Sequence, residues 1–276
     1  MLRGRGGRKL PASSFRPAES AAVPQYSSYV ICGTPRSGST LLCEMLAASG
    51  VAGRPNSYFR EQSFGYWARE WGVPHEGGTD TVAFDRAFLP AMIREGTNGT
   101  GIFGLRLMWV SVAEASRRLD RLFGGSADVT ERLEQAFGPP LYIHLSRRDK
   151  VAQAVSLVRA EQSGLWHLAA DGSVLEGDET IRPNSYDGRR IGELVSELES
   201  DGVAWDGFFK ARGIEPVRLV YETMTADPQS ALATVLAALG RDPALAQSVP
   251  VPTSKMGGTT SREWAERFRR ENGLTT

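Results

Sequence analysis

The 276-residue chain has only two cysteines and three histidines, and it lacks a long apolar run. The cysteines, Cys32 and Cys43, have no zinc-type spacing and are too few for a disulfide framework, which favours a reducing cytoplasm. No pair of histidines has metal-ligand spacing either, so metal catalysis is not expected. Without a run of about 18 apolar residues, no membrane span is expected.

The chain also has no excess of charge of either sign. Lys+Arg and Asp+Glu number 32 each, so no overall field attracts nucleic acid or a membrane, and any anion site must be made locally. Residues 1–26 carry basic residues but no apolar core of a secretory signal, which predicts a disordered basic leader. Residues 27–276 show no repeat or clear boundary, and we expect them to form a single domain.

Short apolar runs alternate with helical patterns along this domain. The alternation predicts an α/β fold with a mostly parallel β-sheet flanked by helices on both faces. The expected strands are Tyr29–Cys32, Ile102–Met108, Leu141–Leu145 and Val217–Tyr221. The expected helices cover 38–49, 81–95, 112–123, 149–163, 187–212 and 227–239. Segment 165–186, with Gly, Asp, Pro and Asn, is expected to form a loop or lid.

A glycine-bounded loop, GTPRSGST, joins the first strand to the first helix. It fits the phosphate-loop pattern G-x-x-x-x-G-K-[ST] at Gly33, Gly38 and Thr40, but Ser39 stands in the lysine position. Such a loop points unpaired backbone N–H groups at a ligand from the positive end of the helix dipole, which suits an anion. Additional side-chain donors come from Arg36, Ser37, Ser39 and Thr40. The alternative is a tight turn that serine merely caps.

A second cationic corner follows the third expected strand, which ends in Ser146-Arg147-Arg148. These arginines would repel Mg²⁺, which a nucleotide triphosphatase needs at this place. Ser156 lies nine and eight residues beyond them, so Arg147 or Arg148 and Ser156 are predicted to clamp a second phosphate. Surface arginines beside a buried helical serine are the alternative.

Taken together, the two elements resemble sulfotransferases that use 3′-phosphoadenylyl sulfate (PAPS), and most closely the bacterial trehalose 2-sulfotransferase family. The similarity runs from about residue 28 to 270 and leaves only the leader uncovered. It rests on Arg36–Leu42, Gly50–Pro55, Gly104–Trp109, Gln153–Ser156 and Ser261–Arg267. The resemblance implies a P-loop-like fold, no metal, and transfer of a sulfuryl group from PAPS to a hydroxyl group.

The resemblance also implies roles for individual residues. The implied cofactor-binding residues are Pro35, Arg36, Ser37, Gly38, Ser39, Thr40, Arg147, Ser156 and Lys255. Arg36 and Ser39 are expected to act in catalysis, by stabilising charge on the bridging oxygen as it leaves. Tyr58, Arg106 and Trp166 are expected to bind the acceptor, a small molecule such as trehalose, another sugar or a glycolipid. A homodimer is possible by the same resemblance.

One departure from the family concerns the general base. The family's glutamate is replaced by Ser57, which cannot accept a proton at neutral pH, and its lysine is replaced by Arg106. We expect Glu61 to serve as the catalytic base, because a helical segment would move the carboxylate by only about 6 Å over four residues. His167 and His75 are reserve candidates, whereas His144 lies in a strand and is expected in the core.

Two other functions stay open at this point. A kinase or nucleotidase with a degenerate P-loop would need Mg²⁺ and acidic ligands at a strand end, and none is evident. A PAPS-binding protein without turnover would explain the loss of the glutamate at position 57. Among the tryptophans, core packing is favoured for Trp109 and Trp205, and Trp166 is the preferred acceptor contact.

Overall fold

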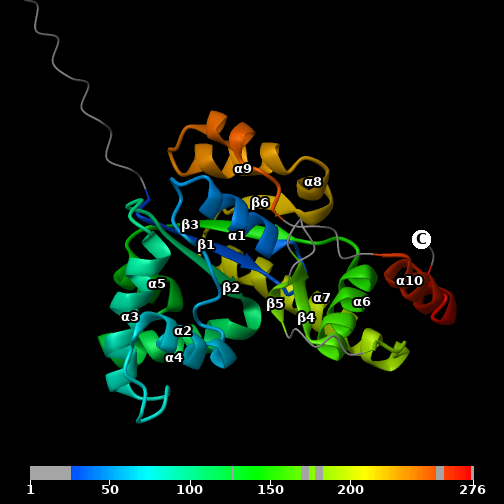
Figure 1. The fold of residues 1–276 in the computed structure, drawn as a ribbon, viewed down its shortest axis with the longest axis horizontal. Helices are drawn as coiled ribbons and strands as arrows, with labels where there is room; N and C mark the ends of the chain where they lie inside the picture. The colour runs from blue at the N-terminus through cyan, green and yellow to red at the C-terminus, as the bar shows by residue number, and fades with distance from the viewer. Residues whose placement is uncertain (1–25, 126, 169–173, 178–182, 253–257, 275–276) are drawn as a thin grey trace, which may run out of the picture.

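The computed structural model describes residues 26–274 except 126, 169–173, 178–182 and 253–257. At its centre lies a four-stranded sheet with the order β2-β1-β3-β6, in which every pairing is parallel (Figure 1). The strands are β1 (Ser28–Gly33), β2 (Phe103–Met108), β3 (Pro140–Ser146) and β6 (Val217–Val220). All four lie where strands were predicted, although Tyr221 begins a helix instead of ending β6.

The six helices predicted from the sequence are present, with small differences at their ends. They are α1 (Ser39–Ala48), α3 (Val82–Thr97), α4 (Val112–Phe123), α6 (Lys150–Ser163), α7 (Gly188–Ala211) and α9 (Pro228–Ala238). The sequence analysis missed α2 (Phe64–Trp71), α5 (Val129–Phe137), α8 (Tyr221–Ala226) and α10 (Thr259–Glu271). It also missed the 3₁₀ turns η1 (Glu61–Ser63), η2 (Trp109–Ser111) and η3 (Pro243–Ser248).

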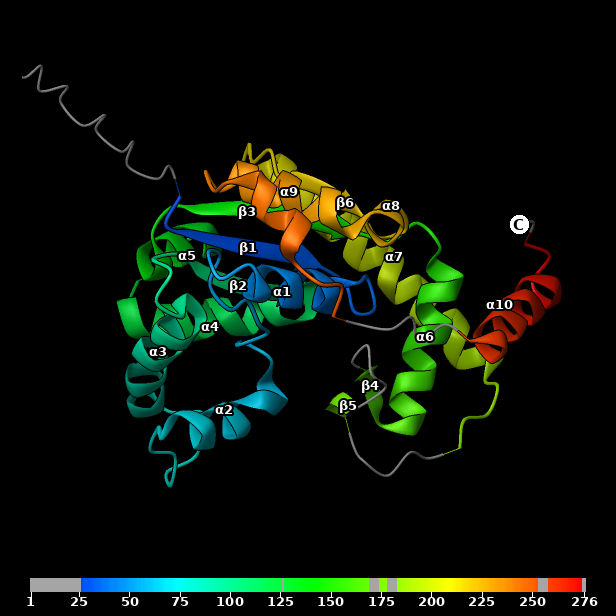
Figure 2. The same ribbon diagram turned by 45° about the horizontal axis from the view of Figure 1, so that its top comes forward.

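Alternate side chains of β1 point to opposite faces of the sheet, as the pleat of a strand requires. Val30 and Cys32 join a core cluster with α2, α3, α4, α5 and part of α7. Tyr29 and Ile31 join a second cluster with α1, α8 and α9. The two groups of helices lie on opposite sides of the sheet (Figures 1 and 2). The protein therefore has the predicted α/β fold, a P-loop-like parallel sheet covered on both faces.

A third cluster packs beyond the carboxyl ends of the strands, where α10 lies against α6 and α7. Trp264 and Phe268 of α10 are buried there with Val158 of α6 and Leu194 of α7. This packing positions α6, which carries the second predicted motif. In the described part of the chain no helix has both the length and the apolarity to cross a bilayer. Both cysteines are buried, and they form no disulfide with each other.

The segment predicted as a loop or lid contains two short strands. β4 (Leu165–Leu168) pairs with β5 (Val174–Gly177) in an antiparallel arrangement. The prediction of an irregular segment was therefore wrong for these eight residues, because strands of four residues are too short to show clear alternation among Gly, Asp and Asn. Residues 169–173 and 178–182 of this segment lie outside the described residues.

Candidate active site

The carboxyl ends of the parallel strands meet at one edge of the sheet, and the glycine-bounded loop lies there between β1 and α1. The loop takes two residues through left-handed backbone, Arg36 with φ of 61° and Gly38 with φ of 86°. A Cβ at Gly38 would lie 2.7 Å from side-chain atoms of both Met224 and Tyr221. The second glycine of the motif is thus required both by its backbone and by the close packing of α8.

Two buried side chains hold the start of the loop. Trp205 of α7 donates from Nε1 to the carbonyl of Gly33 at 2.9 Å. Gln153 of α6 donates from Nε2 to Thr34 Oγ1 at 2.8 Å and to the carbonyl of Pro35 at 2.6 Å. Trp205 and Gln153 are both fully buried. Because α6 and α7 supply these bonds, the loop is fixed relative to the second motif.

The structure brings the two predicted motifs together. Arg36 donates from Nε to Ser156 Oγ of α6 at 3.0 Å. Arg147, directly after β3, donates from Nη1 to the carbonyl of Arg36 at 3.0 Å, and its guanidinium lies 4.2 Å from the centre of the Tyr221 ring. Burial lowers the pKa of Arg147 below its ordinary value. The loop after β1, the end of β3 and the face of α6 thus form one cationic cluster.

Arg148, the other candidate for the phosphate clamp, has an exposed side chain. Its backbone N–H donates to Glu222 at 3.1 Å, and that of Asp149 donates to the same carboxylate at 3.2 Å. Burial alone would raise the pKa of Glu222, but these backbone bonds and nearby Arg147 lower it below its ordinary value. Glu222 therefore holds the turn between β3 and α6.

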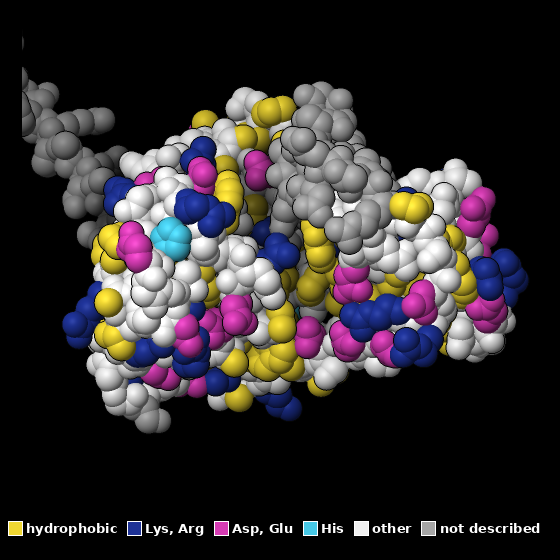
Figure 3. All heavy atoms as spheres, turned by 60° about the horizontal axis from the view of Figure 1, so that its bottom comes forward, with side chains coloured by type: hydrophobic (Ala, Val, Ile, Leu, Met, Phe, Trp, Pro, Cys, Tyr) yellow, Lys and Arg dark blue, Asp and Glu magenta, His cyan; other side chains and the backbone are white. Residues whose placement is uncertain are grey.

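A cleft of about 1110 Å³ opens beside the loop, between segment 57–62 and helices α6 and α7. Figure 3 shows a hollow between the two sides of the molecule, bordered by charged side chains. Its volume is slightly above the range usual for small-molecule sites. Of the predicted site residues, those that line it are Pro35, Arg36, Gly38, Ser39, Thr40, Glu61, Arg106 and Trp166.

Trp166 lies at the cleft next to two arginines. Arg36 donates from Nη1 to the carbonyl of Trp166, which connects β4 to the loop between β1 and α1. Arg60 lies over the Trp166 ring, with 5.4 Å between its guanidinium carbon and the ring centre. The indole thus forms part of the cleft wall, as its predicted role at the acceptor requires.

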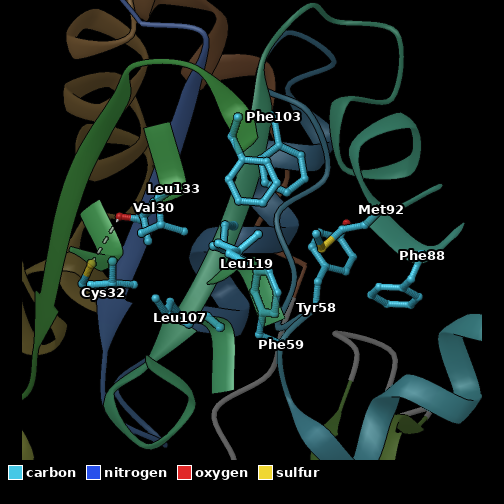
Figure 4. Packing of buried hydrophobic residues seen from close by; sticks show 14 of the residues in the cluster. Val30, Cys32, Tyr58, Phe59, Phe88, Met92, Phe103, Leu107, Leu119 and Leu133 are labelled. Carbon is cyan, nitrogen blue, oxygen red and sulfur yellow. Dashed lines mark hydrogen bonds between the residues drawn. The ribbon is translucent and has the colours of Figure 1, made fainter. Parts of the chain in front are cut away.

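Tyr58 lies elsewhere than predicted. Its side chain is 2% exposed and belongs to the core cluster seen in Figure 4, where its ring packs edge-on at 5.6 Å against Trp67 and Trp71. Its hydroxyl donates to the carbonyl of Arg54, and burial raises its pKa. The predicted acceptor contact is therefore wrong for Tyr58 in this structure. The next residue, Phe59, is buried in the same cluster but also lines the cleft.

Ser57, at the position of the family's glutamate, is bonded to Arg106. The guanidinium of Arg106 donates from Nε to Ser57 Oγ and from Nη1 to Thr40 Oγ1, both at 2.7 Å. Arg106 is 9% exposed and Ser57 is 8% exposed. The hydroxyl of Ser57 therefore serves as an acceptor for a cation, and this position supplies no base.

Glu61 lines the cleft, but not through the helical segment that was expected to connect it with Ser57. Helical structure begins only at Glu61 itself, with η1, so Ser57 and Glu61 do not share a helical face. Both residues nevertheless line the cleft, and the Glu61 side chain is exposed to it. A carboxylate is thus available near the loop in spite of the serine at position 57.

The histidines and Lys255 lie away from the cleft or outside the described residues. His75 bonds to the carbonyl of Val73 at 3.0 Å and does not line the cleft. His144 is buried in β3, where burial lowers its pKa, and its ring nitrogen lies 3.0 Å from Arg218, as expected for a core residue. The side chain of His167, in β4, and the whole of Lys255 lie outside the described residues.

The site combines a phosphate-type loop that lacks its lysine, a cationic corner from β3 and α6, and an adjoining cleft. In the described ranges no group of three or more His, Cys, Asp or Glu side chains is placed to hold a metal ion. These features define an α/β protein with a local cationic site of the kind that suits phosphate-type anions, next to a cleft of the size of a small-molecule site.

Comparison with known proteins assigns the family. The chain belongs to the Stf0 sulphotransferase family, whose model matches residues 28–271. It is 30% identical over 261 residues to trehalose 2-sulfotransferase of Mycobacterium tuberculosis strain Erdman, which covers 88% of this chain and 94% of that protein. It is 31% identical over 267 residues to the trehalose 2-sulfotransferase of Mycolicibacterium smegmatis, covering 89% and 95%. The sequence resemblance and the predicted transferase class are thereby confirmed.

Among solved structures, the sulfotransferase domain of the Synechococcus PCC 7002 olefin synthase is similar with a TM-score of 0.37 and 18% identity. The match covers 90% of this chain and 96% of that domain.

Proposed function

We propose that this sulfotransferase moves a sulfuryl group from PAPS to a hydroxyl group of a carbohydrate or glycolipid acceptor. The observation that carries the proposal is the bond between Arg36 and Ser156, which joins the loop to the second motif at one end of the cleft. Glu61 and Trp166 line the same cleft, as a base and a sugar-stacking ring would have to. The names of the two mycobacterial relatives support a sugar as the acceptor.

In the proposed reaction an oxygen of the acceptor attacks the sulfur of PAPS. A new S–O bond forms while the bond from sulfur to the bridging phosphate oxygen breaks, so that the nucleotide leaves as 3′,5′-bisphosphate (PAP). Backbone N–H groups of the loop, Ser39 and Arg36 stabilise the charge that develops on the bridging oxygen. The carboxylate of Glu61 takes the hydroxyl proton. Arg147 and Ser156 hold the 3′-phosphate throughout.

A PAPS-binding protein without turnover is the second candidate, and the bond between Ser57 and Arg106 favours it, because the family's base position is occupied by a neutral acceptor. A single measurement distinguishes the two functions. A binding protein holds PAP but releases no sulfated product, whereas the transferase forms one product molecule for each PAPS consumed.

The test is an acceptor screen with sulfur-labelled PAPS, starting with trehalose and extending to other sugars and glycolipids. We expect labelled product with at least one of these acceptors. The rate should be unchanged by excess EDTA, because the loop lacks the lysine that acts together with Mg²⁺ in nucleotide triphosphatases. Activity that EDTA abolishes and Mg²⁺ restores would favour a kinase-type reaction. PAP binding without product from any acceptor would favour the second candidate.

A single domain over residues 27–276, a homodimer and a cytoplasmic location stay predictions. Analytical ultracentrifugation of the purified protein tests the homodimer.

A further inference from the structure

Arg106 connects the two halves of the site by three hydrogen bonds. Its Nη1 donates to Thr40 of the cofactor loop at 2.7 Å. Its Nε donates to Ser57 at 2.7 Å, and its Nη2 donates to Asn56 Oδ1 at 3.4 Å. The same Asn56 oxygen accepts from the backbone N–H of Ser57 at 2.7 Å. Each of the three guanidinium nitrogens thus has its own oxygen partner, either on the loop (Thr40) or on segment 56–57.

The backbone strengthens this connection. The N–H of Arg106 donates to the carbonyl of Asn56 at 3.0 Å, and Asn56 pairs with Leu105 as a parallel bridge. The N–H of Tyr58 donates to the same Asn56 carbonyl at 3.0 Å. Segment 56–58 is therefore attached to β2 as a short extension of the sheet, and the side chain of Arg106 continues the attachment to the loop.

The partners of the buried guanidinium are all neutral oxygens. Within the described residues no carboxylate lies within ion-pair distance of Arg106, unlike Arg118, which is also buried and pairs with Asp85. A buried cation without a carboxylate depends on correctly placed hydrogen-bond acceptors. The forked, planar shape of the guanidinium then fixes the distance between Thr40 and Ser57, because one rigid group bonds to both.

We propose that Arg106 is a positioning residue, which sets the separation between the cofactor loop and segment 56–61 that carries the proposed base. The proposal rests on the proposed function, because that separation decides how the acceptor hydroxyl meets the sulfuryl group. Arg106 acts through Thr40 and Ser57, and the fork of its guanidinium matters more than its charge. A misplacement of about 1 Å at a reacting centre can reduce the rate about a hundredfold.

Arg106→Lys tests this, because lysine keeps the charge but not the rigid fork. With PAPS as the donor and trehalose as the acceptor probe, we expect kcat to fall at least tenfold. The PAP dissociation constant, measured by calorimetry, should change less than threefold. The matched control is Arg132→Lys in α5, a guanidinium that is 5% exposed, bonds through all three nitrogens and lies away from the cleft. It should lose stability but keep kcat.

Two results would overturn the proposal. An Arg106→Lys protein with wild-type kcat would show that charge alone suffices. A loss of PAP affinity as large as the loss of kcat would place Arg106 among the cofactor-binding residues.

Hydrogen–deuterium exchange tests the same connection without any reaction. In Arg106→Lys the amides of Ser57 and Tyr58 should exchange severalfold faster than in the wild type, and in Arg132→Lys they should not. Unchanged exchange in Arg106→Lys would overturn the proposal even if no acceptor is ever found. If the wild type transfers no sulfuryl group, the proposed function fails while this measurement still decides whether Arg106 holds the segment.

Ser57→Ala provides a second variant, since it removes one acceptor of the fork and no charge. If Arg106 acts through Ser57, this variant should lower kcat as well, and combining it with Arg106→Lys should add little to the effect of either. Additive losses would show that the two residues act independently.

Discussion

Replacing Arg147 by alanine tests the proposal that Arg147, and not Arg148, holds the 3′-phosphate of the nucleotide. The side chain is largely buried, donates to the carbonyl of Arg36 at 3.0 Å and stacks on Tyr221. Its Nε is buried and has no hydrogen-bond partner among the described residues. Within the described ranges Arg148 makes neither contact, and its backbone N–H is bonded to Glu222.

The expected magnitude follows from the bonds that Arg147 provides. A hydrogen bond that involves a charged group contributes about 1.5–3 kcal/mol. Since 1.4 kcal/mol corresponds to a factor of ten, losing one such bond to the phosphate weakens PAP binding about ten- to a hundredfold. The lost bond to the Arg36 carbonyl acts in the same direction, because it leaves the loop less well fixed.

Calorimetric titration with PAP measures the effect, and Arg148→Ala is the matched control in the same turn. We expect Arg147→Ala to lose affinity and Arg148→Ala to stay within about threefold of the wild type, a difference below 1 kcal/mol. The reverse order would refute the reasoning and make Arg148 the clamp. A circular dichroism spectrum of each variant checks that the fold is retained.

Three further predictions concern the base, the loop and a buried histidine. Glu61→Gln should lower kcat by about 10²-fold or more with unchanged PAP affinity, and wild-type turnover would show that the base lies elsewhere. In urea unfolding, Gly38→Ala should cost about 2–3 kcal/mol, since it combines left-handed backbone with a 2.7 Å contact, whereas Gly50→Ala, left-handed with open space, should cost about 1 kcal/mol. Burial lowers the pKa of His144, so below pH ~6.5 this histidine binds a proton more readily in the unfolded chain than in the folded protein. The free energy of unfolding should therefore fall as the pH drops through that value. His144→Gln should remove this contribution.

Much of the fold was predictable because strands and long helices carry their signal locally. Continuous apolar runs indicated the four strands, and Asp227 followed by Pro228 indicated the start of α9, where the Asp227 side chain accepts from Ser230 N–H at 3.0 Å. The approach of the first loop to the second motif was also predictable, since the segments that follow parallel strands converge at one edge of the sheet. The short helix α8 was missed, because six residues give no clear period.

Contacts between distant residues were beyond a sequence pattern. Tyr58 and Phe59 are adjacent aromatic residues that are both buried in the core, and nothing in their order indicates that only Phe59 also lines the cleft. The bond from Arg106 to Ser57 spans 49 positions and depends on segment 56–58 pairing with β2. The sequence shows that Ser57 and Arg106 differ from the residue types of the family, but only the folded structure shows that these two residues contact each other.

The left-handed backbone at Arg36 has a consequence for engineering this protein. Left-handed backbone destabilises a residue that has a side chain by roughly 1–2 kcal/mol, whereas glycine adopts it without this cost. Replacing Arg36 by glycine would relieve this strain, yet it would delete the guanidinium that reaches Ser156 and Trp166. Screening variants for heat resistance alone would thus reward loss of activity at this position. A thermostability campaign on this protein should therefore keep residue 36 fixed and search elsewhere.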